Sequence, residues 1–251
     1  MRKIAFILPN FETGGMASFT YRLASFLLKD YKIIFISVEV SSIPKTFNKI
    51  GEIKIFSNEW NSLYKYIKET KIEIVQYSMY RMIADVCIAA GVPIIIERMD
   101  GYKGGAILSN KSMLSAVIAS TKSTVRPIRK LIKNDKIFQI YNGIDSKISN
   151  YNEPDRLGFS DDQIIIGRAS VLHQGKNISI LIQAFKELLK IHSNIKLVIV
   201  GGNSKKHGFF DELGHLKKMC ADISEHVRFT GHVDNPIPYM MGFDIFTCTS
   251  K

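Results

Sequence analysis

The sequence predicts an α/β protein built from two Rossmann-like domains, each a doubly wound parallel sheet covered by helices. Short apolar runs alternate along the chain with stretches of helical periodicity, which is the order expected of parallel strands joined by crossover helices. A polar, turn-rich segment at 146–162 interrupts this series. We therefore expect a first domain at 1–145, a linker at 146–162 and a second domain at 163–251 that is incomplete.

The first domain is predicted to hold a sheet buried on both faces. Its apolar runs are continuous rather than alternating, which is typical of parallel strands with helices on either side. The expected strands are 4–8, 32–38, 52–56, 72–77, 93–97, 114–119 and 136–140. The expected helices are 16–27, 44–50, 59–70, 79–90 and 121–134.

The second domain begins with a strand–helix–strand unit at 164–202. Ile164–Ile166 is a short apolar run, and a polar loop follows it. Apolar residues then recur with the spacing of an amphipathic helix, at Ile178, Leu181, Ile182, Phe185, Leu188 and Leu189. A second apolar run at 195–200 ends in Gly201-Gly202. A helix at 209–222 and strands within 227–233 and 243–248 are expected to continue the sheet.

Composition excludes several classes of protein. The chain is 46% hydrophobic and 23% charged, as in ordinary globular proteins. No apolar run approaches the ~20 residues of a membrane-spanning helix, and the N-terminal run is too short for a signal peptide. We expect a cytoplasmic protein whose cysteines, Cys87, Cys220 and Cys248, are free thiols.

The positive charge is concentrated in the first half of the chain. Residues 1–150 contain 22 Lys/Arg and 12 Asp/Glu, whereas residues 151–251 contain 12 and 11. This asymmetry favours an anionic partner for the first half. The basic stretch 121–136, predicted as a helix, could lie against an anionic membrane surface, or could simply be a solvated face.

Motifs of other chemistries are missing from the sequence. Its six histidines all lie beyond residue 172 and have no metal-ligand spacing with Cys or carboxylates. It contains no G-x-S-x-G elbow, no P-loop and no G-x-G-x-x-G fingerprint. Charge alone suggests nucleic acid, without any supporting motif. We expect no metal, no cofactor and no nucleic-acid partner.

Two cations mark a candidate ligand site. Arg168 and Lys176 lie in the loop region that follows the first strand of the second domain, just before a predicted helix. Ligands of open α/β sheets bind beyond the carboxyl ends of the strands. Cationic side chains beside a helix N-terminus suit a phosphate-bearing ligand.

These residues also carry a family resemblance. The stretch GRASVLHQGKNISILIQAF at 167–185 resembles the signature that opens the C-terminal domain of retaining GT-B glycosyltransferases of family four, also described as glycosyl transferases group 1. IYNGID at 140–145 and VRFTGHV at 227–233 resemble further family segments in family order. The resemblance implies a GT-B fold and a nucleotide-sugar donor whose diphosphate is held by Arg168 and Lys176.

The resemblance implies further donor contacts. Gly14 and Gly15 match the family's glycine loop, which faces the donor diphosphate, and a glycine pair between strand and helix lets backbone approach a ligand closely. Gly201 closes the strand at 195–200. Gly231 and His232 match the segment whose following loop holds the nucleotide base.

Asp100 is the candidate for an acceptor-side catalytic group. It lies in a polar loop with three glycines at 98–105, after a predicted strand. Family members often carry His or His-Asp near this position, and this chain has no histidine there. An exposed loop carboxylate without a catalytic role is an equally weighted alternative.

The chain ends before the acidic Glu-x7-Glu signature of the family. On the resemblance, that signature binds the sugar and the ribose. We therefore expect a truncated and inactive enzyme as given, with Phe243, Ile245 and Phe246 more exposed than in a buried strand, and with easier proteolysis after about residue 200 than within 1–145.

The favoured function is transfer of a sugar from a nucleotide-sugar to a hydroxyl of a glycan or lipid-linked acceptor, in cell-surface polysaccharide synthesis. The resemblance implies retention at the anomeric carbon. The alternatives are a related GT-B enzyme, such as a nucleotide-sugar 2-epimerase, and a non-catalytic nucleotide-sugar-binding module. We expect the protein to be peripheral at the inner face of the cell membrane.

Overall fold

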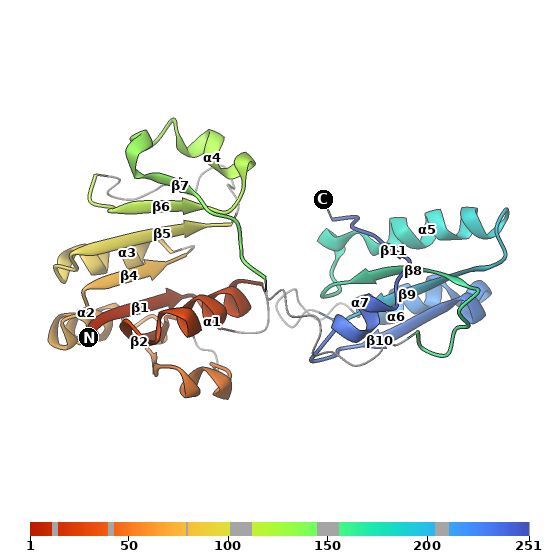
Figure 1. The fold of residues 1–251 in the computed structure, drawn as a ribbon, viewed down its shortest axis with the longest axis horizontal. Helices are drawn as coiled ribbons and strands as arrows, with labels where there is room; N and C mark the ends of the chain where they lie inside the picture. Colours follow the sequence, from red (N-terminus) through yellow and green to blue (C-terminus); the bar gives the residue numbers. More distant parts are fainter. Residues whose placement is uncertain are drawn as a thin grey trace. The chain divides into compact units, whose positions relative to one another are not determined.

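The computed structural model describes residues 1–11, 15–39, 43–78, 80–100, 112–144, 156–203 and 211–250. The chain divides into two compact units, Met1–Asp145 and Ser146–Lys251. Each unit contains one parallel sheet with helices on it, which confirms the predicted fold class (Figure 1). No helix within the described ranges is long and apolar enough to cross a membrane.

The first unit contains a seven-stranded sheet in the order β3-β2-β1-β4-β5-β6-β7, with every neighbouring pair parallel. The strand order reverses at β1, as in a doubly wound fold. Because all neighbouring pairs are parallel, the carboxyl ends of the strands share one edge. The strands are β1 Arg2–Leu8, β2 Tyr31–Ser37, β3 Glu52–Ile55, β4 Ile74–Tyr77, β5 Ile94–Met99, β6 Ala116–Ala119 and β7 Ile137–Gln139.

Alternate side chains of these strands fill two cores. Ile4 and Phe6 of β1 pack on one face with residues of α1, while Ala5 and Ile7 pack on the other face with α2, α3 and α4. The helices are α1 Gly15–Leu27, α2 Trp60–Thr70, α3 Arg81–Ala89 and α4 Lys122–Ile128, with 3-10 turns η1 Lys45–Lys49 and η2 Asn134–Lys136.

Two predicted helices of this unit are wrong in type or length. The helix expected at 44–50 is the 3-10 turn η1, and the basic helix expected at 121–134 ends at Ile128. Pro127 lies within α4 and has no N–H to donate, which weakens continuation of the helix. The basic residues of this stretch are thus spread over a short helix and the turns behind it.

The second unit contains a four-stranded parallel sheet in the order β10-β9-β8-β11. Its strands are β8 Ile164–Ala169, β9 Ile195–Val200, β10 Val227–Gly231 and β11 Ile245–Phe246. Its helices are α5 Ile178–Leu189, α6 Glu212–Met219 and α7 Ile237–Met241, with 3-10 turns η4 Gln174–Lys176 and η5 Ala221–His226. The helix expected at 209–222 is therefore described as α6 followed by η5.

The amphipathic pattern of α5 is confirmed by its packing. Ile178, Leu181, Ile182 and Phe185 are buried against β8 and β9, whereas Leu188 at the end of the helix is 38% exposed. Burial of such side chains is worth roughly 1.5–3 kcal/mol each. This helix fixes the loop that precedes it, which carries Lys176.

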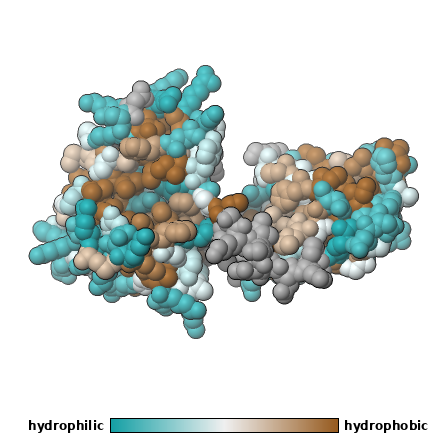
Figure 2. Space-filling model, in the orientation of Figure 1, coloured by the Kyte–Doolittle hydropathy of each residue, from teal (hydrophilic) through white to brown (hydrophobic). Residues whose placement is uncertain are grey.

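The last strand is shorter than the 243–248 predicted. Ile245 and Phe246 form β11 and are 50% and 52% exposed, as expected, whereas Phe243 is half-buried beside Phe159. Apolar as well as hydrophilic residues lie on the visible face of each unit (Figure 2). Single exposed apolar side chains are normal on protein surfaces and need no special explanation.

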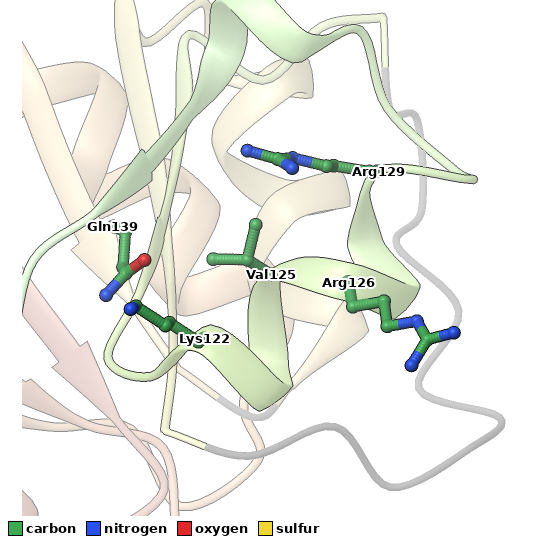
Figure 3. Close-up of a pocket in the computed structure, with 5 residues that line it drawn as sticks. All are labelled: Lys122, Val125, Arg126, Arg129 and Gln139. Atoms are coloured by element: carbon green, nitrogen blue, oxygen red, sulfur yellow. The ribbon is translucent and has the colours of Figure 1, made fainter.

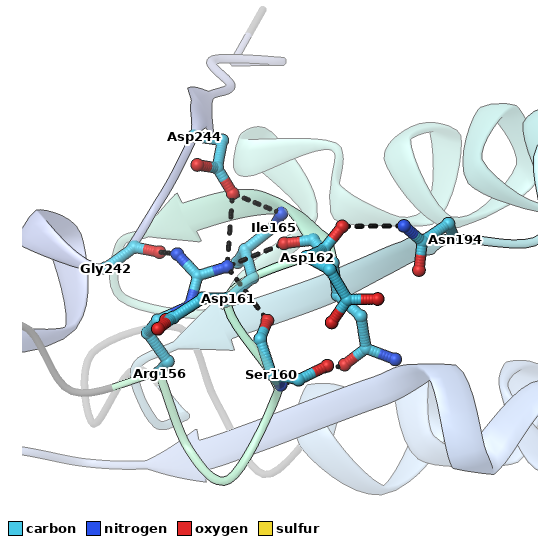
Figure 4. Close-up of polar contacts among 9 residues, drawn as sticks. Arg156, Ser160, Asp161, Asp162, Ile165, Asn194, Gly242 and Asp244 are labelled. Carbon is cyan, nitrogen blue, oxygen red and sulfur yellow. Dashed lines mark hydrogen bonds and ion pairs between the residues drawn. The ribbon is translucent and has the colours of Figure 1, made fainter.

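Arg156 connects the first described residues of the second unit to the rest of that unit (Figure 4). Its guanidinium donates hydrogen bonds to the carbonyl oxygens of Gln163, Ser160 and Gly242, at 2.6, 3.3 and 3.3 Å. It also lies 3.5 Å from a carboxylate oxygen of Asp244, which accepts a bond from the Ile165 amide. Arg156 therefore joins the segment before β8 to the residues before β11.

Candidate functional site

The carboxyl edge of the second sheet gathers most of the predicted donor residues. Arg168 lies near the end of β8, Gly201 follows β9, and Gly231 ends β10 with His232 after it. Because all four strands are parallel, these positions meet at one edge, where open α/β sheets bind ligands. The structure thus brings these four residues to one side of the unit.

Arg168 is almost completely buried, at 3% exposure. β8 is an inner strand, so the side chain is enclosed by the segment that follows β11. Its guanidinium donates to the carbonyl oxygen of Thr247 at 3.0 Å and to Ser250 Oγ at 2.9 Å, and Nε lies 3.4 Å from Ser170 Oγ. All three acceptors are neutral, and no carboxylate in the described part of the chain pairs with Arg168.

Lys176 ends the turn η4, and α5 begins two residues later. The turn is capped by His173, whose Nδ1 accepts from the Gly175 amide at 3.1 Å. The carbonyl oxygen of Lys176 accepts from Thr249 Oγ1 at 2.9 Å. The segment 247–250 therefore bonds both to the Arg168 side chain and to the Lys176 backbone, which holds the two positions in one local framework.

The glycines of this edge are required by the backbone. Gly201 has a φ of +134°, and a Cβ there would lie 1.9 Å from the Ser170 carbonyl oxygen. Its amide donates to the Gly231 carbonyl oxygen at 3.0 Å, and Gly231 has a φ of +69°. His232 is exposed next to this contact, with Nε2 3.6 Å from Asp234 Oδ1. Gly201, Gly231 and His232 thus lie side by side.

The segment after β11 is the part of the site that sequence reasoning missed. Thr247, Thr249 and Ser250 bind the Arg168 and Lys176 positions, and Cys248 is exposed between them. A hydrogen bond from the Arg168 guanidinium holds the pKa of the Cys248 thiol below its ordinary value. The run of small hydroxyl residues after an apolar strand was the available signal.

The first unit places Asp100 beside a buried arginine. Arg98, at the end of β5, is 3% exposed, and its Nε lies 3.4 Å from Asp100 Oδ1. Its guanidinium also donates to Asn142 Oδ1 and lies over the Phe19 ring of α1, 3.9 Å from the centroid. Burial lowers the Arg98 pKa, and the Asp100 charge opposes that shift. Arg98 was not predicted as a site residue.

The structure describes only some of the other residues predicted for the site in the first unit. Gly15 is the first residue of α1, whereas Gly14 lies outside the described residues. A catalytic role for Asp100 stays a prediction, since its described partner is Arg98. Within the described ranges, no group of three or more His, Cys, Asp or Glu is placed to hold a metal ion.

Comparison with known proteins gives a family match for the second unit and structural matches for the fold. Residues 162–251 match the family model described as "Glycosyl transferases group 1". Comparison with curated proteins finds no match. Among solved structures, Alr3699/HepE of Anabaena, in complex with UDP and glucose, superposes with a TM-score of 0.79 at 15% identity, covering 100% of this chain and 74% of its own.

Two further structures show the same fold. A glycosyltransferase from Rickettsia africae has a TM-score of 0.79 at 17% identity, covering 99% of this chain and 73% of its own. UDP-GlcNAc 2-epimerase from Methanocaldococcus jannaschii has a TM-score of 0.65 at 13% identity, covering 97% and 77%.

The chain therefore has the GT-B fold, with two Rossmann-like domains of which the second is smaller. Residues 162–251 are similar to the glycosyl transferases group 1 family.

Proposed function

We propose that this protein transfers a sugar from a nucleotide-sugar to a hydroxyl group of a glycan or glycolipid. One observation carries the proposal. Arg168 is a buried cation at a ligand-binding sheet edge, within the segment that matches the family, and none of its described hydrogen-bond partners is charged. A buried charge without a countercharge is unfavourable, and an anionic ligand relieves this.

The chemistry assigned to this edge is stabilisation of a departing diphosphate. Arg168 and Lys176 would neutralise the charge that develops on the leaving oxygen, as preorganised donors do in other active sites. The N-terminus of α5, which begins two residues after Lys176, adds the positive end of a helix dipole. Retention of the anomeric configuration is proposed from the family resemblance.

The first unit is proposed to bind the acceptor, with Asp100 as the candidate catalytic group. Gly14 and Gly15 are proposed, from the family resemblance, as contacts of the donor diphosphate. The excess of basic residues in the first unit supports a peripheral position on an anionic membrane surface, such as the inner face of the cell membrane, in polysaccharide synthesis. Co-sedimentation with liposomes tests that position, because salt should weaken binding to anionic vesicles and purely neutral vesicles should not bind.

A nucleotide-sugar 2-epimerase is the second candidate, because UDP-GlcNAc 2-epimerase also shares the fold. The family match at 162–251 favours glycosyl transfer. The first unit also has no histidine in its sequence, so it lacks one acid–base side chain suited to epimerisation.

Binding of nucleoside diphosphates tests the proposal. UDP, ADP, GDP and dTDP are titrated against the chain by calorimetry, each beside its nucleoside. We expect one diphosphate to bind far more tightly than its nucleoside, and Lys176→Ala to weaken it by roughly 10- to 100-fold, the worth of one charge-assisted contact.

Lys190→Ala is the matched control. Lys190 lies just after the far end of α5, where it pairs with Glu187 at 2.7 Å, so its removal makes the same change in net charge away from the sheet edge. Equal effects of the two variants, or no preference for diphosphate over nucleoside, would contradict the proposal.

A further inference from the structure

A basic pocket lies between α4 and β7 in the first unit, and none of its lining residues is among the donor residues described above. It has a volume of about 340 Å³ and is lined by Lys122, Val125, Arg126, Arg129 and Gln139. Lys122 and Arg129 extend to the side of Val125 that faces Gln139 of β7, whereas Arg126 extends the other way (Figure 3). Two cations and a carboxamide thus surround one apolar residue.

No carboxylate in the described part of the chain pairs with the cations of this pocket. Lys122, Arg126 and Arg129 form no ion pair with any residue that the structure describes, and residues 121–144 contain six basic residues but one acidic residue, Asp135. Lys136 of the same stretch differs, because its ammonium donates to the carbonyl oxygens of Ser112 and Leu114, at 2.9 and 2.7 Å. Like charges held close together repel, so an anion bound among them would be favourable.

The pocket also lies at the ligand-binding edge of its sheet. Lys122 begins the helix that follows β6, and Gln139 is the last residue of β7. Both strands are parallel to the rest of the sheet, so these are carboxyl ends. The N-terminal amides of α4 are satisfied in part by Thr121 Oγ1, which accepts from the Thr124 amide at 3.2 Å. The anion would therefore be held by side chains.

We propose that this pocket binds the phosphate group of a phosphomonoester or diphosphate ligand, as an anion site separate from the one around Arg168. Arg129 presents a planar fork that matches two phosphate oxygens, and Lys122 adds a point charge. Gln139 donates through its carboxamide, and Val125 contacts the apolar part of the ligand. The site does not depend on the proposed glycosyl transfer.

Inorganic pyrophosphate is the soluble probe for this site. It is titrated by calorimetry at low salt into the full chain, with a saturating amount of the preferred nucleoside diphosphate present to occupy the Arg168 edge. The pocket variant, Lys122→Gln with Arg129→Gln, should bind pyrophosphate roughly 100-fold more weakly, since two charge-assisted contacts are lost. The control variant, Lys130→Gln with Lys133→Gln, removes the same charge from the same stretch but no residue that lines this pocket. It should keep most of the affinity for pyrophosphate.

Vesicles distinguish a lipid phosphate from a free one. Phosphatidylcholine vesicles doped with phosphatidic acid present an exposed phosphomonoester. Phosphatidylcholine vesicles doped with phosphatidylglycerol carry a similar negative charge but present no phosphomonoester. Loss of pyrophosphate binding in the pocket variant identifies a soluble ligand, and selective loss of phosphatidic acid binding identifies a lipid headgroup. Either result supports the site.

The site is overturned if neither probe binds, or if the pocket variant and the control variant lose binding equally. These outcomes are independent of the Lys176 experiment, because that experiment measures nucleoside diphosphates at the other unit. Thermal unfolding of both double variants checks that each is folded, as expected for substitutions of exposed side chains.

Discussion

Each unit has a buried arginine at an equivalent position in its sheet, and the two arginines have different partners. Arg98 and Arg168 both lie near the carboxyl end of a parallel strand, and both are 3% exposed. Arg98 has a carboxylate, Asp100, within 3.4 Å and lies on the Phe19 ring. Arg168 donates to the neutral oxygens of Ser170, Thr247 and Ser250 and hydrogen-bonds the Cys248 thiol, and no described carboxylate pairs with it.

The difference in partners fits a structural role for Arg98 and the proposed anion-binding role for Arg168. The charge of Arg98 is compensated within the protein, so its contacts join β5 to α1 and to Asn142 before the linker. The charge of Arg168 is not compensated by the residues around it, and a bound anion would supply the missing charge. Burial alone does not distinguish the two residues, whereas the charge of the partners does.

The largest expected effect is on stability, when Arg98 is removed. Arg98→Gln leaves Asp100 without its ion-pair partner and removes the contact with Phe19, so we expect a loss of about 3 kcal/mol. The estimate lies at the lower end for buried pairs because the Asp100 side chain is 26% exposed. Urea unfolding followed by fluorescence measures the loss.

Arg126→Gln is the control for that experiment, since Arg126 is exposed on α4 and should change stability by about 0.5 kcal/mol or less. A similar small loss for Arg98→Gln would show that Arg98 does not hold the first unit together. That result would contradict the structural role given to Arg98.

A smaller effect is expected at Cys248, which reports the charge of Arg168. The Arg168 hydrogen bond lowers the Cys248 thiol pKa, whereas burial raises the pKa of Cys220 to about 11 and that of Cys87 to about 12. Only the thiolate reacts with iodoacetamide. Cys248 should therefore be alkylated first, and at a lower pH than an ordinary exposed thiol.

Arg168→Gln should shift the pH profile of Cys248 alkylation upward, because the stabilised thiolate loses its donor. Mass spectrometry of the intact and digested protein, over a pH series, follows each cysteine separately. An unchanged profile in Arg168→Gln would mean that the guanidinium does not act on the segment 247–250 in solution.

The sequence was sufficient for the elements whose pattern is local. The apolar run Ile164–Ile166 and the helical spacing through Phe185 lie within one continuous stretch, and the structure places β8 and α5 there. Arg168 and Lys176 were predicted as donor contacts because cations that follow such a run lie near a sheet edge, and that role stays a prediction. Pro127 was the local signal that the predicted basic helix would end early.

What the sequence did not predict depends on contacts between distant residues. Arg98 looks like part of a polar loop, because the strand was expected to end at residue 97 and its partners Phe19 and Asn142 lie far from it in the chain. The bonds from Arg168 to Thr247 and Ser250 likewise join residues 79 and 82 positions apart. Only the folded sheet shows that these groups meet.

The most direct test of the contrast between the arginines is the affinity for the preferred nucleoside diphosphate. It is measured by calorimetry for Arg168→Gln, Arg168→Lys and Arg98→Gln, each corrected for its folded fraction. We expect Arg168→Gln to weaken binding by roughly 10- to 100-fold, Arg168→Lys by less, and Arg98→Gln by no more than about twofold. Unchanged affinity in Arg168→Gln, or an equal loss in Arg98→Gln, would contradict the account.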